Sequence, residues 1–168
     1  MKKILLIITT ILLTTSLFSQ KTPCNLTESI ENGKTIYRGE RNYVTTNYED
    51  LRVCVQYLYD SERHCLELTL DTKEALSVEK NSIAYIQFAE DLEEELKLND
   101  IVINEKNNKI SCRYALSAEQ EKIFSLQPIQ AIYFSTKEYS QIEIPELNKY
   151  TAKKIMERFN CGINTIGK

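Results

Sequence analysis

Two runs of residues, 53–59 and 64–70, alternate in side-chain character with a period of two, and this alternation constrains the fold more than any other feature of the chain. A period of two is typical of a β-strand, because successive side chains of a strand point to opposite faces of a sheet. The polar residues between the runs, 60–63, predict a turn. We therefore expect an antiparallel hairpin in which Tyr59 lies opposite His64.

Short apolar or alternating runs predict further strands along the chain. These runs are residues 35–39, 41–46, 82–88, 101–104, 109–116 and 129–135. The acidic stretch 89–98 has a composition that favours helix, but Leu96 and Leu98 alternate with charged neighbours, so we interpret it as a turn followed by a strand. The patterns together predict about eight to ten strands.

Two helices are expected. Ser117 and Gln120 have the spacing of a capping box, in which two side chains satisfy free backbone N–H groups at the start of a helix. Pro128 limits the length of this helix. A second helix is predicted to begin at Glu146 and to be capped by Gly162, because apolar residues recur at helical spacing between these positions.

These elements predict an α+β fold, mainly an antiparallel β sandwich or curled sheet with a short internal helix and a C-terminal helix. Residues 21–168 have the length of one ordinary domain, and no internal boundary or repeat is visible in them.

The first twenty residues have the pattern of a secretory signal peptide. Lys2 and Lys3 precede an apolar stretch, residues 4–18, after which Ser19 and Gln20 return the chain to polar sequence. As a helix this stretch spans about 22 Å, less than the ~30 Å hydrocarbon core of a bilayer. We therefore favour cleavage after Ser19 or Gln20 over a retained membrane anchor. The prediction is a secreted or periplasmic protein with no transmembrane anchor after cleavage.

The charge balance excludes several kinds of partner. Without residues 1–20, which contain two lysines and no acidic residue, 19 basic and 24 acidic residues remain, a net charge of −5. Nucleic acids and anionic membranes bind clustered Lys and Arg side chains, so neither is expected as a partner. Four glycines cannot supply a Gly-rich phosphate loop, and one histidine cannot supply a two-histidine metal site. No cofactor and no metal ion are expected.

Five cysteines, an odd number, lie in the part of the chain predicted to be exported, where disulfides are permitted. In the hairpin register Cys54 and Cys65 lie about 13 Å apart, beyond the ~7 Å Cα separation that a disulfide allows. We favour a bridge between Cys24 and Cys161, which would tie the two ends of the domain, and buried free thiols are the alternative.

The run SIAYIQFAED…LKL…CRYALSAEQEKIF…IQAIYF, within residues 82–134, resembles a recurring pattern of small exported bacterial domains of unknown function. In that pattern a strand, an acidic turn and a second strand precede a Y-x-L-[ST]-x-E segment, a short helix and a final I-x-x-I strand. The resemblance covers about a third of the chain. It implies an exported β-rich domain and no catalytic residue.

Two groups of side chains are candidates for chemistry. His64 and Cys65 are an adjacent base and nucleophile, but neighbours on a strand point to opposite faces and cannot bond to each other as a catalytic pair must. Residues 90–95 are rich in acids and could hold a calcium ion, yet they lack the glycine and the ligand spacing of a calcium loop, so we interpret them as a solvated turn. Paired carboxylates for glycoside cleavage stay open, since sequence spacing does not set their separation in space.

The ten tyrosines are the other candidate. Tyr57 and Tyr59 share one face of the predicted hairpin, and Tyr85 or Tyr114 would join them if the neighbouring strands align. An aromatic face with a polar rim binds proteins or sugars well. The alternative is that tyrosine serves here only as a good strand residue.

The sequence thus predicts a non-enzymatic binding domain, either periplasmic or at the cell surface, that contacts a protein or another envelope component through tyrosines, strand edges and an acidic rim. One alternative is a small envelope hydrolase that uses carboxylates or a Cys/His pair. A second is a carbohydrate-binding module. The partner and the oligomeric state are left open.

Overall fold

The computed structural model describes residues 24–72, 77–89, 91–104 and 109–166. The predicted signal peptide, residues 1–20, lies outside the described residues. Within them ten strands and two helices occur. The elements are β1 (Thr27–Glu31), β2 (Lys34–Arg38), β3 (Asn42–Val44), β4 (Leu51–Tyr59), β5 (His64–Thr72), β6 (Ile83–Phe88), β7 (Glu93–Asn104), β8 (Lys109–Ala115), α2 (Ala118–Leu126), β9 (Ile129–Phe134), β10 (Ile142–Ile144) and α3 (Lys149–Thr165).

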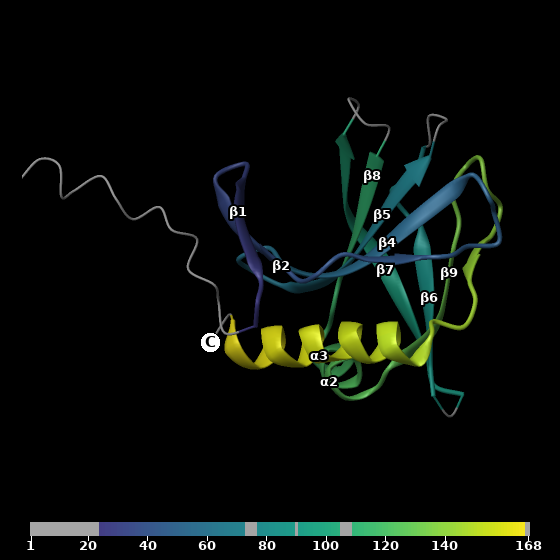
Figure 1. The fold of residues 1–168 in the computed structure, drawn as a ribbon. Coiled ribbons are helices and arrows are strands. Elements are labelled where there is room, and N and C mark those ends of the chain that lie inside the picture. The colour runs from purple at the N-terminus through teal and green to yellow at the C-terminus, as the bar shows by residue number, and fades with distance from the viewer. Residues whose placement is uncertain (1–23, 73–76, 90, 105–108, 167–168) are drawn as a thin grey trace, which may run out of the picture.

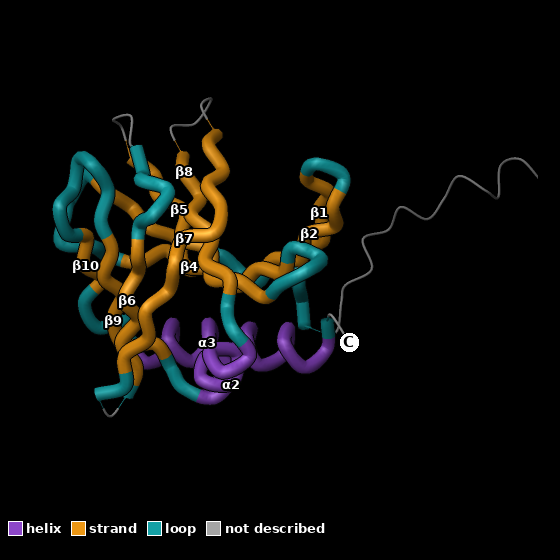
Figure 2. The backbone as a smooth tube through the Cα atoms, turned by 180° about the vertical axis from the view of Figure 1, so that it is seen from behind, coloured by secondary structure: helices purple, strands orange, loops and turns teal. Residues whose placement is uncertain are grey.

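The strands form one antiparallel sheet in the order β1-β2-β4-β5-β8-β7-β6-β9-β10, with β3 beside β4. The sheet curls, and both helices lie at one end of it (Figures 1 and 2). The α+β prediction is confirmed, and the architecture is that of the curled sheet.

The hairpin predicted from the alternation is present as β4 and β5. Tyr59 lies opposite His64 and Cys54 lies opposite Thr69, so the register agrees with the prediction. The acidic stretch is also a turn followed by a strand, but this strand runs on through residues 101–104 as one long element, β7.

Strand β7 makes the curl. Residues 93–97 pair with β6, and the rest of the strand pairs with β8. A break in register between Leu98 and Asp100 separates these two parts. Such bulges bend a strand and let it pass from one layer to the next. The β4, β5 and β8 part of the sheet therefore faces the β6 and β9 part across a shared apolar core.

Helix α2 closes the open end of this core. The Ser117 hydroxyl accepts the backbone N–H of Gln120, and the Gln120 side chain accepts that of Ser117, so the predicted capping box is present. Phe124 of α2 packs edge-on against Phe88 of β6, with ring centroids 5.1 Å apart, and also contacts Phe159 of α3.

Helix α3 differs from the prediction at both ends. It begins at Lys149 instead of Glu146, because the Asn148 side chain caps it by accepting the backbone N–H of Thr151. It also continues to Thr165, past the glycine that was expected to cap it. Neither helix within the described residues has the length and apolarity to cross a bilayer.

Gly162 is a contact position inside α3, not its end. A Cβ atom at this glycine would lie 2.2 Å from Cζ of Tyr57 on β4. The Tyr57 ring also packs edge-on against Phe159, one turn earlier in α3, with ring centroids 5.2 Å apart. The missing side chain therefore lets α3 lie directly on a tyrosine of the sheet.

A loop from the other side of the curl closes the β10 edge. The backbone N–H of Asn47 donates to the carbonyl of Glu143 at 3.1 Å, and the N–H of Glu143 donates to Oδ1 of Asn47 at 2.9 Å. The Asn47 side chain also donates to the carbonyl of Gln141. Asn47 thus takes the place of a neighbouring strand and satisfies backbone groups that an edge strand would otherwise expose.

Candidate functional site

The structure does not bring the four predicted tyrosines together on one exposed face, because two of them are buried in the core and one lies on the outer side of β6. Tyr57 and Tyr114 share a face, as expected, but both are buried in the core. Tyr59 is half-buried beside His64. Tyr85 points to the outer side of β6, away from the other three, and lies opposite Tyr133 of β9.

His64 has a structural role in the core. Its Nδ1 lies 2.8 Å from the hydroxyl of Tyr57, and the imidazole is buried. Burial lowers the pKa of His64, because the charged form loses water, although the carboxylates of Glu121 and Asp60 oppose this shift. The neighbouring Cys65 lies on the opposite face, packed against Ile36 and Leu58. The structure therefore separates the two members of the predicted Cys/His pair.

The cysteines divide into one disulfide and three free thiols. Cys24 and Cys161 are bonded, with Cα atoms 5.7 Å apart, which confirms the favoured bridge. Cys54, Cys65 and Cys112 are free and buried. Burial raises the pKa of Cys54 to about 11 and those of Cys65 and Cys112 to about 12, so all three thiols are protonated near neutral pH.

The acidic run does not gather into a metal site where it is described. Glu90 lies outside the described residues, and Asp91 adopts a positive φ of 60° in the turn before β7. Glu94 accepts a hydrogen bond from the side chain of Gln120 at 3.1 Å. Across the described part of the chain, no three Cys, His, Asp or Glu side chains lie close enough to hold a metal ion together.

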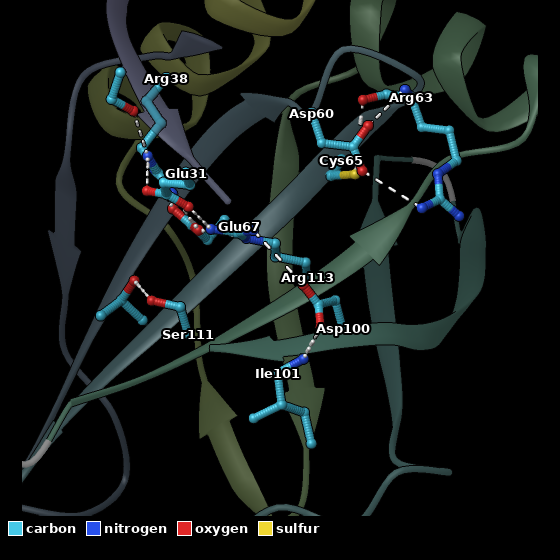
Figure 3. A network of polar contacts seen from close by, with 12 residues as sticks. Glu31, Arg38, Asp60, Arg63, Cys65, Glu67, Asp100, Ile101, Ser111 and Arg113 are labelled. Carbon is cyan, nitrogen blue, oxygen red and sulfur yellow. Dashed lines mark hydrogen bonds and ion pairs between the residues drawn. The ribbon is translucent and has the colours of Figure 1, made fainter. Parts of the chain in front are cut away.

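The most highly organised polar site is one that the sequence analysis missed, on the outer face of β4, β5 and β8. Glu67 of β5 is 2% exposed and binds two arginines (Figure 3). Arg38 of β2 donates through Nε and Nη2 to its two carboxylate oxygens at 3.0 and 3.3 Å, and Arg113 of β8 donates through Nε at 3.0 Å. We call Glu31, Arg38, Glu67 and Arg113 the arginine cluster.

Glu31 of β1 completes the arginine cluster. Its carboxylate bridges Nη1 of Arg38 and Nη2 of Arg113, each at 2.7 Å. Burial alone would raise the pKa of Glu31, but the hydrogen bonds from both guanidinium groups outweigh it, and the pKa is lowered. Asp100 lies further out, 3.6 Å from Nη1 of Arg113. Each arginine is thus bound by carboxylates, and the cluster fastens the β1–β2 hairpin to the sheet.

The strand register contains the signal for this cluster. Glu67 lies directly opposite Arg113 in the β5–β8 pair, so opposite charges face each other across neighbouring strands. The sequence alone does not show that these two charges are neighbours, because β5 and β8 are distant in sequence and their pairing is known only from the structure. Beside the cluster, a recess of about 220 Å³ is lined by polar side chains, among them Thr69 and Ser111, whose hydroxyl groups hydrogen-bond at 2.8 Å.

The outer edge of β1 is a second candidate site. Asn32 and Gly33 have φ angles of 51° and 78°, as a two-residue hairpin turn requires. In such a hairpin Glu31 and Lys34 exchange two backbone hydrogen bonds, and every second pair repeats this pattern. The backbone N–H and C=O groups of Glu28 and Ile30 therefore point away from β2.

Nothing in the described part of the chain pairs with this edge through its backbone. The hairpin projects from the body of the molecule (Figure 1). The Ile30 side chain is 76% exposed, the largest exposure of any bulky apolar residue in the described part of the chain. Open backbone groups beside an exposed apolar side chain are the features that let a strand accept a neighbour.

The third candidate site is a groove of about 900 Å³ beside the helices. Its lining comes from the end of α2, the start of β9 and the first half of α3. Leu126, the last residue of α2, is 67% exposed there. Lys149 and Lys153 of α3 also line it.

Searches against protein-family models, curated proteins and solved structures found no match to this chain. The resemblance of residues 82–134 to exported bacterial domains therefore stays a prediction.

Proposed function

We propose that the chain is an exported, non-enzymatic binding domain that takes an extended segment of a partner protein onto the outer edge of β1. The observation that carries this proposal is the open backbone of Glu28 and Ile30 next to the exposed Ile30 side chain. Main-chain hydrogen bonds would give affinity, and the side chains on either side would give selectivity.

The contrast with the other end of the sheet supports this choice. At β10 the side chain and backbone of Asn47 occupy the positions of a neighbouring strand. At β1 the arginine cluster holds the hairpin to the sheet through Glu31 and through Arg38 of β2, and it leaves the outer edge of β1 clear. Because β1 is already paired with β2, it loses less conformational entropy than an unpaired segment would when a second strand is added.

The chemistry of the nucleophiles supports a binding role over the hydrolase alternative. The free thiols are buried and have raised pKa values, and His64 bonds to Tyr57. Glu31 and Glu67 bind arginine. The disulfide between Cys24 and Cys161, together with the apolar segment at residues 4–18, supports export, because such bonds persist in oxidising compartments.

Two substitutions at one position test the mode of binding. Ile30→Pro removes an N–H that points outward, so the β1–β2 ladder is kept while the edge is blocked. Ile30→Ser keeps the N–H and removes only the apolar contact. The immobilised chain is exposed to an extract of the cells that produce it. Strand addition predicts that Ile30→Pro abolishes capture of a protein that the wild type retains, and that Ile30→Ser only weakens it.

Hydrogen exchange on the captured complex gives the independent readout. The amides of Glu28 and Ile30 should be protected when the partner is bound, and the amide of Ser29, already bonded to β2, should not change. Equal capture by the wild type and Ile30→Pro, or unchanged exchange at Glu28 and Ile30, would refute the proposal.

A further inference from the structure

The groove beside the helices is a separate surface with its own chemistry. Lys149, Ala152, Lys153 and Met156 line it at positions i, i+3, i+4 and i+7 of α3, so one continuous face of this helix forms a wall. The adjoining face of α3 carries Ile155 and Phe159 into the core. Ala152 is buried at the base of the wall, and Lys149, Lys153 and Met156 extend the wall beyond the face that α3 packs against the core.

The rest of the lining is mostly apolar. The connection from α2 to β9 contributes Leu126, Pro128 and Ile129. The segment before α3 contributes Leu147. The Leu147 N–H donates to the carbonyl of Gln130 at 2.8 Å, which fixes the two sides of the groove relative to each other. The groove is thus held in shape by the fold, and Leu126 is exposed at its rim.

The α3 side of the groove carries two lysines, of which Lys153 also forms an exposed ion pair with Glu157 at 3.8 Å. Lys149 and Lys153 stand on the first turns of a 17-residue helix, where the helix dipole adds a positive potential. No acidic residue lies in the first turn of α3, and Glu146 is the one acid among the residues that line the groove. This site contrasts with the net charge of −3 carried by the whole chain.

We infer that the groove docks an amphipathic helical segment of a partner protein that carries acidic side chains. Apolar side chains of the segment would contact Leu126 and Met156, and its carboxylates would face Lys149 and Lys153. An amphipathic helix presents apolar side chains and several acidic side chains together on neighbouring faces. A fatty acid offers only one carboxylate to the two lysines, so a polypeptide suits the surface better.

A pair of labelled model peptides tests the charge requirement. Both are 16-residue amphipathic helices with leucines at i, i+3, i+4 and i+7. One has glutamates on its polar face and the other has lysines. In fluorescence anisotropy at low salt, the acidic peptide should bind at least about tenfold more tightly than the basic one. Its affinity should fall as salt screens the lysines.

Variants of the full chain place the peptide in the groove. Leu126→Ser and the double variant Lys149→Glu/Lys153→Glu should each weaken binding of the acidic peptide about tenfold or more. Two controls lie elsewhere and should leave the affinity unchanged. Lys137→Glu makes the same type of charge change in the β9–β10 loop, and Ile30→Ser removes an exposed apolar side chain at the β1 edge. The Ile30 control also separates this inference from the proposed function.

Three results would overturn the inference. The first is equal binding of the acidic and basic peptides, and the second is no binding of either. The third is binding of dodecanoate, lost in Leu126→Ser, without binding of the acidic peptide, which would assign the groove to a small amphiphile. Circular dichroism of each variant confirms that it is folded.

Discussion

The inner face of the central strands β4, β5 and β8 is buried almost throughout, whereas the outer face is buried only around the arginine cluster, and the two are covered by opposite means. The inner face carries aliphatic and aromatic side chains that the helices and the far half of the sheet cover. The outer face carries the arginine cluster, whose charges are matched one against another under the β1–β2 hairpin. The same strands thus exclude water by apolar packing on one face and by paired charges on the other.

The two faces contribute differently to the fold. The hydrophobic effect has no preferred direction, so the apolar side chains of the inner face could be buried in several similar arrangements. Their burial gives most of the free energy of folding. Buried ion pairs repay a large desolvation cost only in one geometry. We infer that the outer face fixes where the β1–β2 hairpin lies more than it adds to stability.

The largest expected effect is at the centre of the arginine cluster. Glu67→Gln leaves two guanidinium groups without their buried counter-charge, and we expect a loss of about 3–5 kcal/mol in the free energy of unfolding. Urea titration followed by circular dichroism measures it. A loss below about 1 kcal/mol would show that water replaces the carboxylate and that this face is not truly buried.

A variant that removes the buried charges together tests whether the cluster adds to stability. The triple change Arg38→Met, Glu67→Leu and Arg113→Met replaces the buried ions with apolar side chains, while the half-buried Glu31 can regain water. The free energy of unfolding should return to within about 1 kcal/mol of the wild type or exceed it. A triple variant no more stable than Glu67→Gln would contradict the view that the cluster serves specificity more than stability.

The next effect is on the inner face. Gly162→Ala adds a methyl group where the Tyr57 ring already lies, and we expect a loss of about 2–3 kcal/mol despite the better helix propensity of alanine. The double variant with Tyr57→Leu should recover part of this loss, because the clash is with the ring. Additive losses in that double-mutant cycle would rule out the contact as the cause.

A smaller loss in the free energy of unfolding is expected for a substitution in the polar recess beside the arginine cluster. Thr69→Val removes the hydroxyl that bonds to Ser111 and keeps the shape of the side chain. Cross-strand pairs of this kind contribute about 0.2–1 kcal/mol, so the free energy of unfolding should fall by no more than this. A much larger decrease would mean that Thr69 takes part in the arginine cluster through contacts with the recess.

The smallest effect is a pH dependence on the inner face. The pKa of His64 is lowered by burial, so the unfolded chain takes up a proton at a higher pH than the folded one. The stabilisation by neutral His64 is present above the unfolded pKa, near 6.5, and is lost as pH falls from there through the lowered folded pKa. In urea titrations at pH 7.5, 6.5 and 5.5, His64→Gln should flatten this decline. An unchanged slope would assign the decline to other groups.

The inner face could be predicted from sequence much better than the outer one. Alternation and turn residues placed the β4–β5 hairpin in its true register, and the capping box placed α2, because these signals are local. The Cys24–Cys161 bridge, favoured because it would tie the two ends of the domain, is also confirmed. The predicted end of α3 at Gly162 was wrong. In the sequence, a glycine that makes room for the Tyr57 ring cannot be distinguished from a glycine that caps a helix.

The candidate site residues could not be predicted for a related reason. Tyr57 and Tyr114 have the pattern of half-exposed residues in an alternating strand, and only the tertiary packing buries them, with helix α3 over Tyr57 and the rest of the core around Tyr114. Glu67 and Arg113 lie 46 residues apart, so their match depends on the strand order, which no local pattern contains. Side chains that act across distant strands therefore escape a sequence analysis even where each strand is predicted correctly.

The bond between Cys24 and Cys161 also determines how the molecule carries mechanical load. A force that pulls on the two ends of the chain passes from sulfur to sulfur and bypasses the sheet. The enclosed stretch, with a sequence separation of 137, holds roughly 450–490 Å of contour length at about 3.3–3.6 Å per residue, and none of it is released until the bond is reduced. Tethered at both ends, the domain would behave as an inextensible link.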